Sequence, residues 1–428
     1  MNLTQCLHRH ARIDRERIAT VFGPRRKTYA QLADRVARLA GGLCALGVGA
    51  DDRVGILMRN SDRYLEAMYA TYWAGGAVNP VNFRWSPDEI AYSLDDCDTR
   101  LLIVDDTFLP LVGELSGRSK SLTTVIHAGD GAPPAGIVSF EALVARHAPA
   151  ADAMRSGADL AGVFYTGGST GFPKGVMNSH AGLYSNALAA VADDIAAAGG
   201  VALHAAPMFH MADIVFFNAS LMTGSTNVII PAFDPVKVLD AIEKEKVTRA
   251  LLVPTMIELT VDHPELARRD TSSLACVLYG ASPISEAVLD RAMKAFPTAA
   301  FIQAYGMTEL SPIITVLSAY WNSVEGLARA NKLRSAGRPT AVADLIIVDA
   351  NDRQVPNGTL GEIVARGPGV MLGYWNKPEE TAAALANGWM HTGDGGYMDD
   401  DGFVFVVDRV KDMIVTGGEN VYSAEVDP

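Results

Sequence analysis

The sequence predicts an α/β protein with two doubly wound, mixed or parallel sheets and surrounding helices, followed by a small β unit. Helical and strand-like segments alternate over residues 28–105 and again over residues 161–303, and short strands joined by Gly, Asn and Asp turns follow residue 337. Strands separated by helical segments form sheets that are covered on both faces. Ligands of such sheets bind beyond the carboxyl ends of the strands, so the loops after those strands are expected to carry function.

The first alternating stretch opens with a predicted helix over residues 28–46. A Thr28/Gln31 capping box precedes apolar residues at helical spacing, namely Leu32, Val36, Leu39, Leu43 and Leu46. The pattern then predicts a buried strand, a second helix and two more strands, over residues 54–58, 62–74, 77–80 and 101–105.

The second stretch begins after a segment rich in Pro, Gly and Ala at residues 128–157. It predicts strands with helices between them, at residues 161–165, 228–231, 250–253, 277–280 and 301–303. The β unit adds strands at residues 345–348, 361–366 and 403–407. The predicted division is one large domain, 1–409, with subdomains at about 1–157, 158–336 and 337–409.

Composition and charge exclude several classes of protein. With 49% apolar residues in a chain of 428, disorder, collagen and coiled coil are excluded. The formal charge of −13 makes general nucleic acid binding unexpected. Four widely spaced cysteines, no signal peptide pattern and turn residues within the uncharged segment 214–233 predict a cytoplasmic protein without a transmembrane segment. The oligomeric state is not predicted.

A glycine-rich loop follows the predicted strand at residues 161–165. Residues 166–175 read Thr-Gly-Gly-Ser-Thr-Gly-Phe-Pro-Lys-Gly. Backbone N–H groups of such a loop can surround an anion, while Ser169, Thr170 and Lys174 add hydroxyl donors and a positive charge. The alternative is a tight connection whose glycines only permit unusual backbone dihedrals.

Two nucleotide-binding patterns do not fit this loop. The phosphate loop GxxxxGK[ST] fails because Lys174 is preceded by Pro173 and followed by Gly175. The dinucleotide pattern GxGxxG fails because Thr166 stands at its first glycine.

A serine hydrolase is the alternative from a different class of enzyme. Residues 167–171 match GxSxG, the nucleophile elbow, with Ser169 as the nucleophile and His391 as a possible partner. The elbow requires a helix directly after the serine, and Gly171, Pro173 and Gly175 disfavour one there.

Five segments together resemble the adenylate-forming superfamily of acyl-CoA synthetases, peptide-synthetase adenylation domains and firefly luciferase. In chain order they are residues 165–176, 279–283, 303–309, 388–394 and 408–414. The resemblance covers essentially the whole chain. It implies the fold of the large N-terminal domain of an acyl-CoA synthetase, whose small β unit is a distorted β-barrel.

The resemblance also implies roles for individual residues in binding ATP. The β- and γ-phosphates would be held by Thr166, Gly167, Gly168, Ser169, Thr170, Gly171 and Lys174. Tyr305 would stack on the adenine, Thr308 would bond the α-phosphate and Glu309 would bind Mg²⁺. The second wall of the adenine site and the ribose contacts would come from Gly280, Ala281, Ser282, Asp394 and Arg409. Lys174, Thr308 and Glu309 are the predicted catalytic residues.

Each role has a structural alternative. A tyrosine such as Tyr305 can be a core residue, Thr308 and Glu309 a solvated pair, and Asp394 a cap. The resemblance also assigns the acyl pocket, to His210, Met211, Gly306 and Met307. A lone histidine among apolar residues is often a core group instead. Lys411 would lie at the hinge before the next domain, unless it is an ordinary linker lysine.

The implied activity is that of an ATP-dependent acyl-CoA ligase that uses Mg²⁺ and takes coenzyme A as co-substrate. It would activate a carboxylic acid as acyl-AMP, with a medium- or long-chain fatty acid expected first and an aromatic acid second. Members of the superfamily continue for about a hundred residues more, the size of an independent domain. Residues 410–428 are expected to be the hinge and a stub of that missing domain, so that ATP and acid bind but catalysis is impaired. A non-catalytic nucleotide or acyl binder is the remaining alternative.

Overall fold

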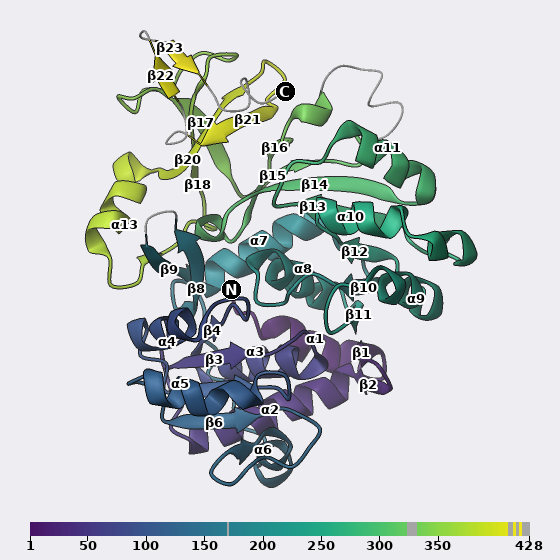
Figure 1. Ribbon diagram of the computed structural model, residues 1–428, viewed down its shortest axis with the longest axis vertical. Helices are drawn as coiled ribbons and strands as arrows, with labels where there is room; N and C mark the ends of the chain where they lie inside the picture. Colours follow the sequence, from purple (N-terminus) through teal and green to yellow (C-terminus); the bar gives the residue numbers. More distant parts are fainter. Residues whose placement is uncertain (169–170, 323–331, 410–413, 417–418, 422–428) are drawn as a thin grey trace.

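The computed structural model describes residues 1–168, 171–322, 332–409, 414–416 and 419–421. Two large sheets are each covered by helices, and a smaller β unit lies beside them at the top of the view in Figure 1. The predicted fold class is confirmed. Residues 410–413, with Lys411, and residues 169–170 lie outside the described residues.

The first large sheet has eight described strands and is mixed. Its parallel part runs from β8 to β7, and an antiparallel hairpin with a short edge strand completes it. In spatial order the strands are β19 (Gly373–Tyr374), β9 (Gly171–Ser179), β8 (Leu160–Gly168), β4 (Ala77–Pro80), β3 (Arg53–Leu57), β5 (Leu101–Val104), β6 (Thr124–His127) and β7 (Val138–Ser139).

The second large sheet has nine described strands and is parallel in its centre. In spatial order they are β16 (Arg338–Pro339), β15 (Ile313–Leu317), β14 (Ala300–Gly306), β13 (Cys276–Gly280), β12 (Arg249–Leu251), β10 (Val201–His204), β11 (Thr226–Ile229), β1 (Ile18–Phe22) and β2 (Arg25–Thr28). The β unit is an antiparallel sheet of β17 (Asp344–Val348), β18 (Gly361–Arg366), β20 (Met390–Met398) and β21 (Val404–Arg409), and β22 (Ile414–Thr416) pairs with β23 (Glu419–Val421).

Helices fill the connections between these strands. They are α1 (Gln5–Ile13), α2 (Tyr29–Ala45), α3 (Asp62–Ala74), α4 (Pro87–Asp96), α5 (Val112–Arg118), α6 (Phe140–Arg146), α7 (His180–Ala192), α8 (Met211–Met222), α9 (Pro235–Glu245), α10 (Pro254–Val261), α11 (Glu286–Ala295) and α13 (Pro378–Ala384). Single 3₁₀ turns are η1 (Leu109–Leu111), η2 (Pro264–Arg268), η3 (Thr308–Leu310), η4 (Lys332–Arg334) and η5 (Ala386–Gly388). None of the described helices is both long and apolar enough to cross a membrane.

The helices begin where local chemistry favours it. The predicted capping box of α2 is present, because the Thr28 hydroxyl accepts from the Gln31 N–H while the Gln31 side chain accepts from the Thr28 N–H. Ser86 and Glu89 form a second box in front of α4. The uncharged segment 214–233 forms most of α8, a turn and β11, as predicted, with Phe216 and Phe217 fully buried.

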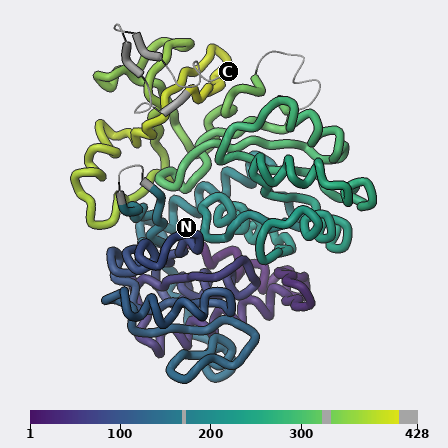
Figure 2. Tube along the Cα trace, in the orientation of Figure 1, coloured from purple at the N-terminus to yellow at the C-terminus, as the bar shows by residue number. Residues whose placement is uncertain are grey.

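The structure differs from the sequence-based expectation in how the sheets are assembled. Strands β8 and β9 belong to the first sheet, although the predicted division starts a new subdomain at residue 158. Strands β1 and β2, near the N-terminus, extend the second sheet beside β11, so the purple end of the chain lies against the teal segment in Figure 2. The predicted boundaries therefore do not coincide with sheet membership, because strand pairing joins segments that are far apart in sequence.

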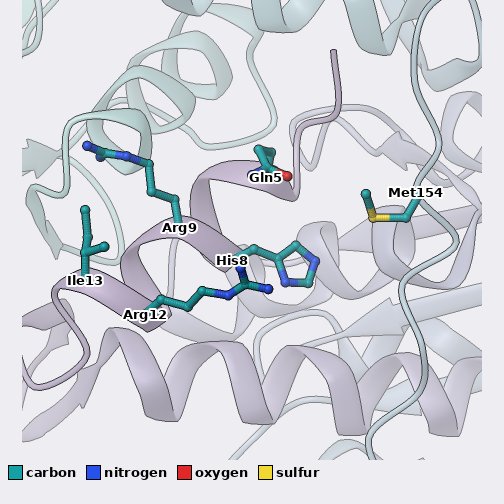
Figure 3. A pocket seen from close by; sticks show the side chains of 6 residues that line it. All are labelled: Gln5, His8, Arg9, Arg12, Ile13 and Met154. Atoms are coloured by element: carbon teal, nitrogen blue, oxygen red, sulfur yellow. The ribbon is translucent and has the colours of Figure 1, made fainter.

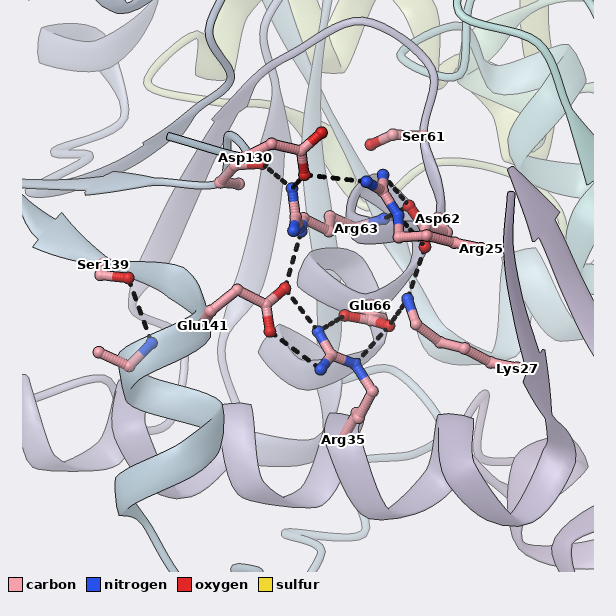
Figure 4. Close-up of polar contacts among 12 residues, drawn as sticks. Arg25, Lys27, Arg35, Ser61, Asp62, Arg63, Glu66, Asp130, Ser139 and Glu141 are labelled. Carbon is pink, nitrogen blue, oxygen red and sulfur yellow. Dashed lines mark hydrogen bonds and ion pairs between the residues drawn. The ribbon is translucent and has the colours of Figure 1, made fainter. Parts of the chain in front are cut away.

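A buried ion-pair network joins the β1–β2 hairpin to the helices of the first sheet (Figure 4). Asp62 at the start of α3 binds Arg25 at 2.8 Å and Lys27 at 2.6 Å, and both cations lie on β2. Glu66, one turn later, binds Arg35 of α2 at 2.8 Å. Burial raises the pKa of Asp62, but the hydrogen bond from Arg25 and the Lys27 charge outweigh burial and lower the pKa to about 2. The network therefore stabilises the contact between the two halves of the protein.

Asp62→Asn is expected to lower the free energy of unfolding by about 2 kcal/mol at pH 7, because a pKa lowered from 3.8 to about 2 corresponds to that magnitude. A depressed pKa stabilises the fold above the unfolded-state value, so the contribution is lost as pH falls from about 4 to about 2. Urea unfolding at pH 7 and at pH 3 measures this. Asp34→Asn, at an exposed pair with Arg38, is the control and is expected to change stability by less than about 1 kcal/mol. Equal effects of both variants would contradict the prediction.

Candidate active site between the two large sheets

A pocket opens at the carboxyl ends of β13 and β14. The enclosed part of this pocket has a volume of about 80 Å³. Gly280, Ala281, Tyr305 and Gly306 line it, and four of the predicted site residues are therefore brought together. The remaining walls are mainly apolar, with Leu251, Val253, Leu278 and Ile313 among them.

Close backbone packing explains the two glycines of this pocket. A Cβ atom on Gly280 would lie 2.2 Å from the Ala304 carbonyl oxygen, its neighbour across the β13–β14 pairing. On Gly306, whose φ is +155°, a Cβ atom would lie 1.8 Å from the Pro312 carbonyl oxygen. Larger side chains at either position would displace the backbone that shapes the pocket.

The predicted adenine and ribose residues meet across the second sheet and the β unit. The Tyr305 hydroxyl, at the end of β14, donates to Asp394 Oδ2 of β20 at 2.7 Å. Asp394 pairs through its backbone with Arg409 of β21. This hydrogen bond fixes the aromatic ring at the pocket and places the Asp394 carboxylate beside it.

Lys174 and Glu309 approach the same aromatic ring from different sheets. Lys174, on β9, places its Nζ 5.2 Å from the centroid of the Tyr374 ring, and the Tyr374 hydroxyl donates to Glu309 Oε1 at 2.9 Å. Glu309 is only 6% exposed. Lys174 Nζ also lies 2.6 Å from Glu380 Oε2 on α13. Tyr374, in the short strand β19, and Glu380, in helix α13, were not among the predicted site residues, because no motif considered in the sequence includes them.

A seam of hydrogen bonds holds η3 against β9. Asn178 Nδ2 donates to the Thr308 carbonyl at 3.0 Å. The backbone N–H of Met371 donates to the Glu309 carbonyl at 2.8 Å, and that of Leu372 to the Met177 carbonyl at 2.8 Å. Residues 371–375 therefore bridge the predicted metal and α-phosphate residues on one side and the strand of Lys174 on the other.

The glycine-rich loop is the turn of the β8–β9 hairpin. Thr166 pairs with Lys174 and Gly168 with Gly171 across it, with Gly167 exposed. Ser169 and Thr170 lie outside the described residues. The strand after the loop disagrees with a nucleophile elbow, which requires a helix. His391, the suggested partner of Ser169, is bound to Glu362 at 2.9 Å on the β unit.

The predicted acyl-pocket residues are divided between the pocket and the core. Gly306 lines the pocket, as does Ala212 at the start of α8. Met211 is buried in the large core cluster, and Met307 packs against the cluster beneath the β unit. Ser282, predicted for the adenine wall, is exposed beyond β13.

His210 and a buried contact between a histidine and an aspartate shape the start of α8. His210 keeps contact with solvent, and partial burial of its ring, together with the Arg84 charge, lowers the pKa of the ring to about 4. The ring is therefore neutral at pH 7. Behind it, His204 of β10 binds Asp213 at 3.1 Å and Asn227 at 3.0 Å, all three fully buried. These polar contacts fix the first turn of α8, and they were not predicted from the sequence.

The donor set suits a hard cation that is bound mainly by a substrate. Among the described residues, no three His, Cys, Asp or Glu side chains gather into a metal-binding group. Glu309 is a single buried carboxylate beside the predicted phosphate residues. Mg²⁺ is typically held by one or two carboxylates together with phosphate oxygens and water, so Glu309 fits the predicted role.

A further hollow lies away from these residues, on the surface of α1 (Figure 3). It is lined by Gln5, His8, Arg9, Arg12, Ile13 and Met154. His8 is bound to Asp152 at 2.7 Å. None of the predicted site residues lines this hollow, so the functional assignment rests on the pocket at β13 and β14.

The chain is similar to known proteins over nearly its whole length. The model of a family described as AMP-binding enzyme matches residues 7–375. A feruloyl-CoA synthase from an Amycolatopsis species is 38% identical over 426 residues, which are 98% of this chain and 81% of that protein. The solved structure of a Mycobacterium tuberculosis fatty acyl CoA synthetase has a TM-score of 0.88 and 30% identity, covering all of this chain and 82% of its own. ATP-bound MatB from Rhodopseudomonas palustris has a TM-score of 0.87 and 28% identity, over 100% and 82% of the two chains.

These similarities confirm the predicted resemblance and the predicted enzyme class, an AMP-forming acid–thiol ligase. Within this fold, Tyr305 binds Asp394, and Lys174 and Glu309 both contact Tyr374. The chain belongs to the AMP-binding enzyme family.

Proposed function

We propose that the chain activates a carboxylic acid with ATP as an acyl-adenylate, releasing pyrophosphate, and then transfers the acyl group to coenzyme A as a thioester, releasing AMP. The observation that carries the proposal is the convergence of Lys174 and Glu309 on Tyr374, together with a pocket lined by Tyr305, whose hydroxyl donates to Asp394. A nucleoside triphosphate can be bound by a cation at its phosphates, a carboxylate that holds Mg²⁺ and an aromatic ring that stacks on the base. Lys174, Glu309 and Tyr305 supply these three groups.

The chemistry explains why these groups are needed. A carboxylate that approaches a triphosphate meets like-charge repulsion, which is about 4 kcal/mol for two unit charges 4 Å apart near a protein surface. Lys174 supplies a positive charge at the phosphates in a protein whose formal charge is −13. Mg²⁺ held at Glu309 would neutralise further charge on the phosphates.

The protein acts by positioning and not through a covalent intermediate on a side chain. In the first step the acid carboxylate attacks the α-phosphorus in line and expels pyrophosphate, so the new acyl–phosphate bond replaces the bond to the β-phosphate. In the second step the thiolate of coenzyme A attacks the acyl carbon and AMP leaves. We assign Thr308 to the α-phosphate, Tyr305 to the adenine and Asp394 to the ribose hydroxyls.

The apolar residues of the pocket favour a carboxylic acid substrate whose remaining part is apolar. Leu251, Val253, Leu278 and Ile313 offer an apolar wall beside the nucleotide residues, which suits a hydrocarbon tail. We propose a medium- or long-chain fatty acid as the substrate. An aromatic acid is the second candidate, because the 38% identical relative is a feruloyl-CoA synthase.

ATP-dependent exchange of labelled pyrophosphate, measured across a panel of acids, tests the function and ranks the substrates. The panel contains fatty acids of eight to eighteen carbons, roughly the medium and long range, and hydroxycinnamic and benzoic acids. Acid-dependent exchange supports adenylation. Ester hydrolysis without ATP, or ATP binding without exchange for any acid, would contradict it. Fastest exchange with a hydroxycinnamic acid would replace the fatty acid by the second candidate.

Glu309→Gln is expected to lower the maximal exchange rate about 100-fold, because the variant keeps the size of the side chain and loses the charge that binds Mg²⁺. Excess Mg²⁺ is expected to restore part of the rate. Glu114→Gln, on the exposed surface of α5, is the matched control and should leave exchange unchanged. A fully active Glu309→Gln enzyme with an unaltered Mg²⁺ dependence would show that this carboxylate does not serve the metal.

Lys174→Ala and Glu380→Gln are expected to change ATP affinity in opposite directions. Lys174→Ala removes the cation and should raise the KM for ATP about tenfold or more. Glu380→Gln removes the carboxylate that binds Lys174 at 2.6 Å, and should lower that KM about twofold to threefold, as expected for an exposed pair. Steady-state exchange at varied ATP measures both. Lys246→Ala, whose lysine binds Asp270 on the surface, is the control. A weaker affinity in Glu380→Gln would show that Glu380 supports ATP binding instead of competing with it.

A further inference from the structure

Tyr374 lies between two functional groups that come from different sheets. Its hydroxyl donates to Glu309 Oε1 at 2.9 Å, and its ring faces the Lys174 ammonium at 5.2 Å from the centroid. Glu309 follows β14 of the second sheet, whereas Lys174 belongs to β9 of the first. One side chain therefore contacts both the carboxylate and the cation that the proposed reaction needs.

Hydrogen bonds to three neighbouring segments hold the backbone around Tyr374, so the position of its Cα atom is well defined. The residue forms part of β19 and pairs with Val176 of β9. Its N–H donates to the Thr381 hydroxyl at 2.9 Å. The next residue, Trp375, donates through its backbone to the Gly175 carbonyl at 2.7 Å and through its indole N–H to the Asp96 carbonyl at 2.8 Å. The ring is thus fixed relative to the strand that carries Lys174.

The two contacts of the ring have different consequences. A hydroxyl that donates to Glu309 Oε1 restricts rotation of the Glu309 side chain and so sets the direction of its carboxylate group. The ring face attracts an ammonium group and contributes modestly to its position. Lys174 also binds Glu380, but ATP phosphates would compete for that contact, whereas the contact with the ring can persist when phosphate is bound.

We propose that Tyr374 is a positioning residue for adenylation, which orients the Glu309 carboxylate for the Mg²⁺ of the substrate and keeps the Lys174 ammonium directed to the phosphates. The proposal rests on the proposed function and deepens it. Tyr374 does not itself bond to the reacting atoms. It couples the phosphate-binding strand of one sheet to the metal-binding turn of the other.

Three variants test the proposal. Tyr374→Phe keeps the ring and loses the hydroxyl, and Tyr374→Leu loses both. Tyr29→Phe removes a buried tyrosine hydrogen bond, to the Ser225 carbonyl at 2.7 Å, that has no part in the site and serves as the matched control. Calorimetric titration of ATP at a series of Mg²⁺ concentrations is the binding measurement, and pyrophosphate exchange is the kinetic one. Melting temperatures identify any variant that has lost its fold.

Tyr374→Phe and Tyr374→Leu are expected to have different effects on the Mg²⁺ requirement and on the affinity for ATP. In Tyr374→Phe the Mg²⁺ concentration for half-maximal ATP binding and exchange should rise about tenfold, since hydrogen bonds to charged groups are worth that factor or more. Its affinity for ATP at saturating Mg²⁺ should stay within about twofold. Tyr374→Leu should in addition weaken ATP binding at saturating Mg²⁺ about threefold, as expected for a lost contact between a cation and a ring. Tyr29→Phe should change neither quantity.

Two results would overturn the proposal for Tyr374. An unchanged or lower Mg²⁺ requirement in a folded Tyr374→Phe variant would overturn the proposal. An equal change in Tyr29→Phe would overturn it too, since the effect would then be one of general stability. If the unaltered protein binds ATP with Mg²⁺ but catalyses no exchange with any acid, the proposed function fails, and the binding titration still tests Tyr374.

Discussion

The seam between β9 and η3 is the contact on which the site depends. Lys174 and Glu309 lie 135 positions apart in the numbering and belong to different sheets, so no local structure can bring them together. The backbone bonds of Met371 to the Glu309 carbonyl and of Leu372 to the Met177 carbonyl place one short segment across both. Because buried backbone groups are costly to leave unpaired, this segment has a defined register on each side. The side chain of Tyr374 adds a direct contact with Glu309 and another with Lys174.

The charged residues of the proposed site and those that join the two sheets form separate groups. The overall charge of −13 repels polyphosphates, so any site for them must gather its own cations. Away from the site, buried acids such as Asp62 and Glu66 are paired with Arg25, Lys27 and Arg35, and these pairs hold the two sheets together. The electrostatics of the fold and of the site are therefore separate, and substitutions in one set need not affect the other.

Most individual elements could be predicted because their signals are local. The Thr28/Gln31 box and the apolar spacing after it predict α2 to within a residue, and the glycine-rich turn with its lysine indicates an anion site. Strand β9 was not predicted, since Pro173 and the glycines around it are poor strand formers; pairing with β8 overrides that preference. Strands β1 and β2 were not predicted either, and their place beside β11 depends on pairing with a segment about 200 residues later in the chain.

Local sequence signals were sufficient for the fold class, for elements such as α2 and for the residue types available for nucleotide chemistry. These follow from periodicity, capping and short motifs, which act over a few residues. The contacts of Tyr374 with Lys174 and Glu309, the hydrogen bond from Tyr305 to Asp394 and the burial of Met211 in the core depend on tertiary packing. Such contacts depend on which strands pair and how two sheets pack, and those choices are made by interactions between segments far apart in the chain.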